Sequence, residues 1–342
     1  MDEAQTFDVA VVGATGVVGE VLIPLLESRD FPLGRLYPLA SERSLGNKVL
    51  LRGNYLSVDD VATFDFSQAA LVFFVCDADT AGRYAPLAAE AGAVVIDTSP
   101  AFRADDDVPL VIPEVNPSHI GRFGERRIIA SPGAATIPLL MILKPLLDAV
   151  GVARVDVTSC QAASGGGRAA VQALASQSAG LLNLRGVEVM PGEQQIAFNL
   201  APQIGELLDN GYTRAEMEMV WESQKVLDDS AIVINPTAVR VPVFFGHSAV
   251  LHIETTQPLE AAQARRLLTA APGVRIMEGP QPADVPSAVG AAAGEDAVFV
   301  GRVRQAIGQP CGVDLWLVSD NVRRGAALNA VQIAEILVKE YL

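Results

Sequence analysis

Hydrophobic residues up to Ala130 follow two alternating patterns. Short runs of consecutive apolar residues, many of them β-branched or aromatic, are bounded by turn residues, which is typical of buried strands. Between Val17 and Ser28 the apolar residues recur three or four positions apart, which predicts an amphipathic helix. The strand-like runs are Phe7 to Val12, Ala70 to Val75, Ala93 to Ile96 and Arg127 to Ala130. Strands that alternate with helices predict a parallel sheet covered on both faces.

Beyond Val152 the pattern changes to longer strand-like segments with helices between them. The predicted elements are strands at Arg154 to Gln161 and Ala231 to His252, helices at about Arg168 to Leu182 and Arg214 to Leu227, and a C-terminal helix at Gly325 to Leu342. This arrangement predicts a mixed or antiparallel sheet with helices on one face. We therefore expect an α/β protein of two domains, the first ending near Pro132.

Composition narrows the range of partners. Of the 342 residues, 50% are hydrophobic and 19% are charged, which describes a compact globular protein. The net charge of -15 argues against nucleic acid as a partner. The acidic start of the chain is unlike a signal peptide, and no apolar run approaches the roughly 20 residues needed to cross a bilayer. We expect a cytoplasmic protein without a membrane partner.

The three cysteines, Cys76, Cys160 and Cys311, lie far apart in the chain. They form neither a zinc-binding spacing nor a disulfide framework. We therefore expect free thiols that pack as small core residues, and no metal site.

A glycine-rich turn lies between the first predicted strand and the first predicted helix. Gly13 permits a tight turn, Gly16 lets the backbone approach a pyrophosphate, and Gly19 lets helix and strand pack closely. The helix N-terminus would face the phosphates. The pattern predicts a dinucleotide-binding loop, with an ordinary strand-to-helix turn as the alternative.

The segment Leu39 to Ser44, which we expect at the end of the second strand, bears on the choice of dinucleotide. Arg43, flanked by Ser41 and Ser44, suits the 2′-phosphate of NADP. Glu42 suits the free ribose hydroxyls of NAD. The segment favours NADP and leaves NAD open.

Several strings in the sequence resemble the aspartate-semialdehyde dehydrogenase family along nearly the whole chain. They are GATGVVG (13–19), LASERS (39–44), PEVN (113–116), SGGG (164–167), RVPV (240–243), GHS (246–248) and SDNVRRGAALNAVQIAE (319–335). The resemblance implies a Rossmann-type NAD(P)-binding domain formed by residues 1–132, on which a helix at 325–342 packs. It also implies a second, α+β domain for substrate binding and dimerisation, formed by residues 133–324.

Enzymes of that family use a cysteine thiolate that attacks the aldehyde, after which hydride passes to NADP and phosphate cleaves a thioester. The resemblance places this cysteine in a strand-to-helix turn, which here runs from Ser131 to Thr136. Ala134 occupies the position of the nucleophile, and its methyl group cannot form the covalent adduct. A relocated nucleophile at Cys160 is the alternative.

The resemblance also implies roles for other residues, which could equally be inherited for structure alone. Gln161 would orient the substrate and His247 would be the general acid/base, while Arg240 would bind the substrate carboxylate and Arg103 would bind phosphate. The expected cofactor contacts are Gly13, Thr15, Gly16, Val17, Val18, Gly19, Ser41, Arg43, Ser44, Gly165 and Asn321.

Two segments depart from the family pattern. Ala215 and Glu218 stand where the family has an acidic residue and a lysine, and a glutamate would repel phosphate. The segment from Val75 to Asp79 replaces a glycine and serine turn beside the cofactor, which puts close approach of the nicotinamide in doubt.

These features favour a family member without the family's activity, similar to the cysteine-less Usg proteins, that forms a homodimer or a hetero-oligomer with an active relative. The alternative is an NAD(P)-dependent oxidoreductase of amino-acid metabolism that acts on a small acidic carbonyl compound without a covalent step. An active aspartate-semialdehyde dehydrogenase is the third hypothesis.

Overall fold

The computed structural model describes residues 5–124, 126–187, 189 and 194–342, and the chain forms two compact units. The first unit contains the described residues up to Gly133 together with Ala326–Leu342. The second unit is Ala134–Gly325. None of the helices in the described part of the chain has the length and apolar character needed to cross a membrane.

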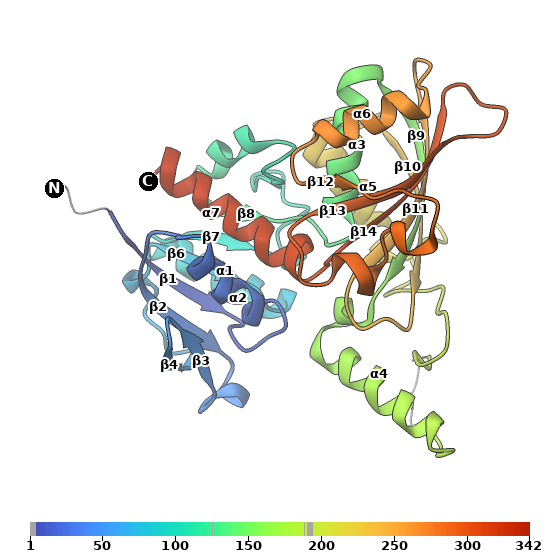
Figure 1. Ribbon diagram of the computed structural model, residues 1–342. Helices are drawn as coiled ribbons and strands as arrows, with labels where there is room; N and C mark the ends of the chain where they lie inside the picture. Colours follow the sequence, from blue (N-terminus) through green and yellow to red (C-terminus); the bar gives the residue numbers. More distant parts are fainter. Residues whose placement is uncertain (1–4, 125, 188, 190–193) are drawn as a thin grey trace. The chain divides into compact units, whose positions relative to one another are not determined.

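A parallel sheet of six strands forms the centre of the first unit (Figure 1). The spatial order is β5, β2, β1, β6, β7, β8, and all neighbouring pairs are parallel. The strands are β1 (Phe7–Val12), β2 (Leu33–Ala40), β5 (Asp59–Asp60), β6 (Leu71–Phe74), β7 (Val94–Asp97) and β8 (Ile128–Ala130). The strand order reverses next to β1, because β2 lies on one side of it and β6 on the other. Ligands of doubly wound sheets bind at such a reversal, outside the carboxyl ends of the strands.

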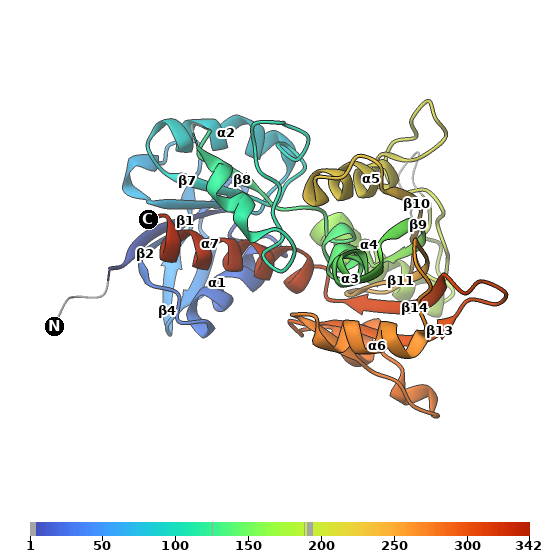
Figure 2. The same cartoon turned by 90° about the horizontal axis from the view of Figure 1, so that it is seen from above.

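Helices cover both faces of this sheet, as the alternating pattern predicts. Helices α1 (Gly19–Ser28) and α7 (Leu328–Glu340) contact each other on one face, and α2 (Ala78–Glu90) lies on the other (Figure 2). Buried residues of β1, such as Val9 and Val11, pack with apolar residues of α1 and α7 in one core. A short hairpin, β3 (Lys48–Leu51) and β4 (Asn54–Ser57), lies beside α1.

The second unit contains a mixed sheet of six strands in the order β10, β9, β11, β14, β13, β12. The strands are β9 (Val152–Gln161), β10 (Val233–Arg240), β11 (His247–Thr255), β12 (Val274–Ile276), β13 (Val298–Gln305) and β14 (Gly312–Ser319). Helices α3 (Thr136–Val150), α5 (Arg214–Leu227) and α6 (Ala261–Ala270) pack against one face, and α4 (Gly167–Leu182) extends away from the sheet (Figure 1). The expected two-domain α/β fold is thereby confirmed.

Two boundaries differ from the sequence prediction. The segment from Ala231 to His252 is two strands, β10 and β11, because residues 241–246 leave the sheet and reverse direction, with Gly246 in a left-handed conformation (φ 91°). The C-terminal helix begins with a π-helical turn at Arg323–Ala327 and becomes an α-helix at Leu328. Hydrophobic periodicity does not distinguish these cases, because both parts of each segment are apolar.

Glu216, inside the segment that departs from the family pattern, is a structural residue. The Thr213 side chain caps α5, and Glu216 completes a capping box by accepting from the Thr213 amide at 2.7 Å. Its other carboxylate oxygen accepts from the Ala238 amide of β10 at 2.8 Å. One buried side chain therefore fixes both the start of α5 and its position on the sheet.

Asp97 is a fully buried carboxyl group at the carboxyl end of β7. It accepts from the Ser99 amide at 2.9 Å and from the Ser99 hydroxyl at 2.8 Å. Burial raises the pKa of Asp97 from 3.8 to about 6, although the bonds from Ser99 and the charge of Arg103 oppose this.

Because this pKa is raised in the folded state, the native protein binds a proton more tightly than the unfolded chain in the window from about 4 to 6. Stability is therefore lost as the pH rises through that window. We expect Asp97→Asn to gain roughly 1 kcal/mol of stability relative to the unmodified protein between pH 5 and pH 7.5, measured by urea unfolding. The exposed Asp106→Asn is the control, and an Asp97→Asn difference that does not change with pH would contradict this assignment.

Candidate functional site

The glycine-rich turn of the first unit has the geometry of a close-packed loop. Gly13 adopts φ 91°, and its amide donates to the Leu39 carbonyl of β2 at 2.9 Å. A Cβ atom at Gly13 would lie 2.6 Å from the Val75 carbonyl, and one at Gly19 would lie 2.7 Å from the Ala14 carbonyl. Both positions therefore exclude any side chain. The turn lies at the carboxyl end of β1, where the strand order reverses.

Helix α1 begins at this loop without a side-chain cap from the described residues. By contrast, Asp77 caps α2 and Thr213 caps α5. Uncapped amide groups at a helix N-terminus are the donors that bind a phosphate in dinucleotide-binding domains. Thr15, Val17 and Val18 lie half-exposed in the same loop. The loop therefore fits a pyrophosphate.

The residues expected to select the dinucleotide follow β2, the neighbour of β1. Ser41, Glu42 and Arg43 are exposed and Ser44 is half-buried. The Ser44 amide donates to the Ser41 carbonyl at 2.9 Å, which closes a tight turn. The segment thus presents both a guanidinium and a carboxylate at the carboxyl edge of the sheet.

The turn after β6 carries Cys76 and Asp77, two residues of the segment that departs from the family pattern. Asp77 accepts from the Thr80 amide at 2.9 Å, so its carboxylate is the cap of α2. Cys76 lies next to Gly13, since a Cβ atom at Gly13 would be 3.2 Å from the Cys76 Cβ. Burial, reinforced by the charges of Asp97 and Asp77, raises the pKa of the Cys76 thiol well above its usual range.

The Arg103 guanidinium forms hydrogen bonds with backbone carbonyls of the first unit. Its Nε donates to the Ser131 carbonyl at 3.0 Å and its Nη2 donates to the Thr98 carbonyl at 2.6 Å. These bonds join the segments that follow β7 and β8. Arg103 therefore has a structural role, and its binding of phosphate stays a prediction.

In the second unit, the strand register places four polar side chains in one row. Arg240 pairs with Gln161, and His247 pairs with Ser319. The last pair of β11 with β9 is Ser248 opposite Cys160, and His247 and Gln161 are the next residues of those two strands, so the row runs across β10, β9, β11 and β14. Directly opposed residues share a face of the sheet and lie about 5 Å apart. The sheet therefore brings the predicted Arg240, Gln161 and His247 together.

His247 is buried and holds one tautomer. Its Nδ1 accepts from the Ala162 amide at 3.2 Å, so the proton of the neutral ring lies on Nε2. Burial, and secondarily the charge of Arg240, lowers the pKa of His247 from 6.5 to about 3. The imidazole is neutral at physiological pH and presents a hydrogen-bond donor.

Arg240 and Gly165 complete this group. The Arg240 Nη1 donates to the Ala162 carbonyl at 2.5 Å, so Ala162 contacts both the guanidinium and the imidazole. A Cβ atom at Gly165 would lie 2.9 Å from Arg240 Nη1 and 3.2 Å from His247 Cε1. Gly165 therefore leaves the space into which these two side chains extend.

Asn321 joins three segments around the same group. Its side-chain oxygen accepts from the Ser164 hydroxyl at 3.0 Å and from the Gly246 amide at 2.9 Å. It is buried. Asn321 therefore holds the loops after β9 and before β11, and its expected contact with the cofactor is untested.

Two polar side chains of the row are without partners among the described residues. Gln161 as a whole is 8% exposed, and the Ser319 hydroxyl is fully buried and unbonded. Buried polar groups in native proteins normally have a partner, so both groups are suited to bind a ligand or water. Sequence reasoning missed Ser319, because its position opposite His247 follows only from the register of β14.

Ala134 lies in the turn before α3, and that helix also begins without a side-chain cap from the described residues. Its Cβ would be 2.8 Å from a Cβ atom placed on Gly325, so the two backbones are in close contact. The half-buried Cys160 belongs to β9, and burial raises the pKa of its thiol. The described structure therefore presents a methyl group at the start of α3 and a protonated thiol at Cys160.

Comparison with known proteins agrees with this arrangement. The profile described as "Semialdehyde dehydrogenase, NAD binding domain" matches residues 8–123, and "Semialdehyde dehydrogenase, dimerisation domain" matches residues 143–324. These matches define the class of protein as a semialdehyde dehydrogenase family member. At the level of whole chains, the protein belongs to the aspartate-semialdehyde dehydrogenase family.

The relatives include both named enzymes and USG-1 proteins. Aspartate-semialdehyde dehydrogenase of Shewanella sp. (strain DB6705) is 50% identical over 338 residues, which cover 99% of each chain. The USG-1 protein homolog of Pseudomonas aeruginosa is 41% identical over 340 residues, covering 99% of this chain and 100% of the relative. The crystal structure of aspartate semialdehyde dehydrogenase II complexed with ASA from Vibrio cholerae matches with a TM-score of 0.96 and 48% identity, covering 99% of this chain and 100% of that chain.

The protonation state of His247 can be measured directly by NMR of the imidazole nitrogens, assigned with His247→Gln. We expect a neutral ring with the proton on Nε2 from pH 8 down to pH 5, because its pKa is about 3. Arg240→Met, which removes the charge and keeps an unbranched apolar stem, should raise this pKa only in part, because burial is the larger cause. A charged ring at pH 6 would show that the site is more solvated than the structure implies.

Proposed function

We propose that this protein is a member of the aspartate-semialdehyde dehydrogenase family that binds a dinucleotide and a small acidic carbonyl compound but does not catalyse phosphate-dependent dehydrogenation. The observation that carries the proposal is the methyl group of Ala134 at the start of α3. Covalent attack on an aldehyde needs a thiolate or a comparable nucleophile, and a methyl group has no lone pair.

The thiols of Cys76 and Cys160 offer poor replacements. Thiolate formation requires a low pKa, whereas burial raises the pKa of both Cys76 and Cys160. Covalent attack also tolerates little displacement of the nucleophile from its optimal position. These properties support an inactive site over a relocated one.

The row of Arg240, Gln161 and His247 is suited to binding. Arg240 supplies a guanidinium for a carboxylate, and Gln161 supplies an amide without a described partner. A neutral imidazole with the proton on Nε2 donates to a carbonyl oxygen, but its lowered pKa makes it a weak base. These side chains would orient a small acidic carbonyl compound without removing a proton from it.

NADP is the cofactor that we propose for the first unit. The loop from Gly13 to Gly19 would hold the pyrophosphate, and Arg43 between two serines would bind a 2′-phosphate. A bound nicotinamide would supply hydride chemistry. The carboxylate of Glu42 keeps NAD as the alternative.

A second function follows from the same residues. Direct hydride transfer to a carbonyl needs no thiol, so Ala134 is compatible with a reductase of a small acidic carbonyl compound. The specific observation in its favour is the Nε2–H donor of His247, which would polarise the carbonyl oxygen. This function requires measurable affinity for the dinucleotide.

The partner that we propose is a second copy of this chain or an active relative. The dimerisation-domain profile covers most of the second unit, which supports assembly through that unit. A hetero-oligomer would let a chain without the nucleophile influence an active one.

The first test is an activity assay with aspartate semialdehyde, NADP and phosphate. We expect no reduction of NADP by the unmodified protein, and Ala134→Cys should stay at least about 100-fold below an active relative assayed in parallel, because a weakly basic His247 and the changes at Ala215 and Glu218 remain. Ala135→Cys, one position further along, is the matched control. Recovery of a relative-like rate by Ala134→Cys alone would show that only the sulfur was missing.

The second test is calorimetric titration with NADP and with NAD. We expect NADP to bind more tightly than NAD, and Arg43→Gln should remove most of the difference because it deletes the partner of the 2′-phosphate. The exposed Arg35→Gln is the charge-matched control. Absence of binding at millimolar concentrations of both dinucleotides would exclude the reductase and leave only a structural or regulatory role.

A further inference from the structure

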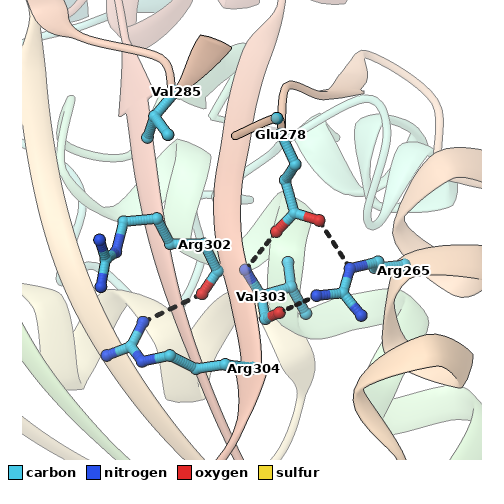
Figure 3. Close-up of a pocket in the computed structure, with 7 residues that line it drawn as sticks. Arg265, Glu278, Val285, Arg302, Val303 and Arg304 are labelled. Carbon is cyan, nitrogen blue, oxygen red and sulfur yellow. Dashed lines mark hydrogen bonds and ion pairs between the residues drawn. The ribbon is translucent and has the colours of Figure 1, made fainter. Parts of the chain in front are cut away.

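The second unit contains a pocket that shares no lining residue with the row of Arg240, Gln161 and His247. Its volume is about 320 Å³. It is lined by Arg265, Glu278, Gly279, Val285, Arg302, Val303 and Arg304 (Figure 3). Three guanidinium groups and one carboxylate make it a positive region in a chain whose net charge is -15.

Two of these side chains have a structural task at the edge of the sheet. Strand β12 pairs with β13 only as far as Val300, so no strand of the described residues lies beside the later part of β13 on that edge. The carboxylate of Glu278 accepts from the Val303 amide at 2.5 Å, and Arg265 donates to the Val303 carbonyl. These side chains replace the missing strand and protect the exposed edge.

Both carboxylate oxygens of Glu278 accept hydrogen bonds in this arrangement. One carboxylate oxygen binds the Val303 amide, and the other accepts from Arg265 Nε at 2.6 Å. The charge of Arg265 is thereby compensated inside the pocket wall. The positive charges that remain in the pocket are those of Arg302 and Arg304.

Arg304 and Arg302 extend to the same side of β13, away from Glu278 (Figure 3). Arg304 donates to the Arg302 carbonyl at 3.0 Å and approaches Asp314 at 3.7 Å, while Asp314 is engaged more closely by His252 at 2.7 Å. The guanidinium of Arg302 forms no hydrogen bond or ion pair with any residue in the described ranges. Two adjacent guanidinium groups with at most one distant carboxylate favour an anionic ligand.

The backbone at Arg302 has a strained conformation, which changes the direction of its side chain relative to a regular strand. Arg302 adopts φ 55°, in the left-handed region that favours glycine. The register of β13 against β14 shifts between Gly301 and Arg304, so Arg302 lies in a β-bulge. A glycine would adopt this conformation without strain, whereas this chain has an arginine at the position. Strain kept at a bulge points to a function of the side chain.

The wall of the pocket opposite β13 is packed closely. A Cβ atom at Gly301 would lie 2.6 Å from the Pro286 ring, and one at Gly279 would collide with the Asp284 side chain. Pro286 therefore packs closely against β13, and Asp284 packs against Gly279 within the segment that forms this wall.

We propose that this pocket is an accessory binding site for a small anion with two or more adjacent negative charges, in which Arg302 and Arg304 grip a phosphate group or a pair of carboxylates. Arg302 is the residue whose charge and orientation the site requires. The pocket shares no lining residue with the proposed dinucleotide and carbonyl sites, so the proposal stands independently of the proposed function.

The test is calorimetric titration of the full chain with inorganic pyrophosphate and with citrate, which distinguish a phosphate ligand from a polycarboxylate. We expect Arg302→Gln to weaken the binding of the preferred anion at least about ten-fold, because a charged hydrogen-bond donor is lost. Arg266→Gln, the same charge change at an exposed position of α6 outside the pocket, should bind like the unmodified protein.

A second variant separates function from folding. Arg302→Gly should keep or raise the melting temperature, because glycine relieves the strain at φ 55°, and should weaken anion binding as Arg302→Gln does. If neither anion binds the unmodified protein, or if Arg302→Gln and Arg266→Gln bind alike, Arg302 is a solvated surface arginine and the proposal is overturned.

Discussion

The chemistry of the second unit depends on a neutral imidazole buried beside a guanidinium. The backbone amide of Ala162 donates to His247 Nδ1, and its carbonyl accepts from Arg240. One residue therefore fixes both the imidazole and the guanidinium. This contact forces the proton of the neutral ring onto Nε2. Burial, and secondarily the charge of Arg240, keeps the ring uncharged. Every role that the site can perform follows from having one fixed cation, one neutral donor and one free amide in a row.

This constraint matters more because of what lies at Ala134. A buried, neutral histidine can bind and orient a substrate, but its lowered pKa makes it a weak base. Under the proposed function, which lacks the sulfur, the same row would serve binding alone or would polarise a carbonyl for a hydride from elsewhere. The high identity to named dehydrogenases therefore establishes ancestry and fold, and the side chains decide between the functions.

The sequence predicted most of the fold, because its strongest signals are local. The runs that became β1, β6, β7 and β8 are continuous apolar segments, and the glycines at 13 and 19 occupy positions where any side chain would collide with backbone. The break between β10 and β11 was missed because both strands are apolar and the connection around Gly246 is short. Site residues were predicted through the family resemblance, whereas Ser319 becomes visible only through strand register. The bulge at Arg302 carries no sequence signal, since an arginine in the left-handed region looks like any other surface cation.

The surroundings of its arginines indicate how this acidic chain would bind the anions proposed for it. With a net charge of -15, anions are repelled at long range, so attraction has to come from guanidinium groups whose charge is not cancelled nearby. Arg240 meets this condition by bonding to a carbonyl in place of a carboxylate, and Arg302 meets it by lying on a bulge away from Glu278. Arg265, by contrast, is neutralised by Glu278 and serves the sheet edge. Whether an arginine of this protein binds an anion or stabilises the fold is therefore decided by what its guanidinium touches.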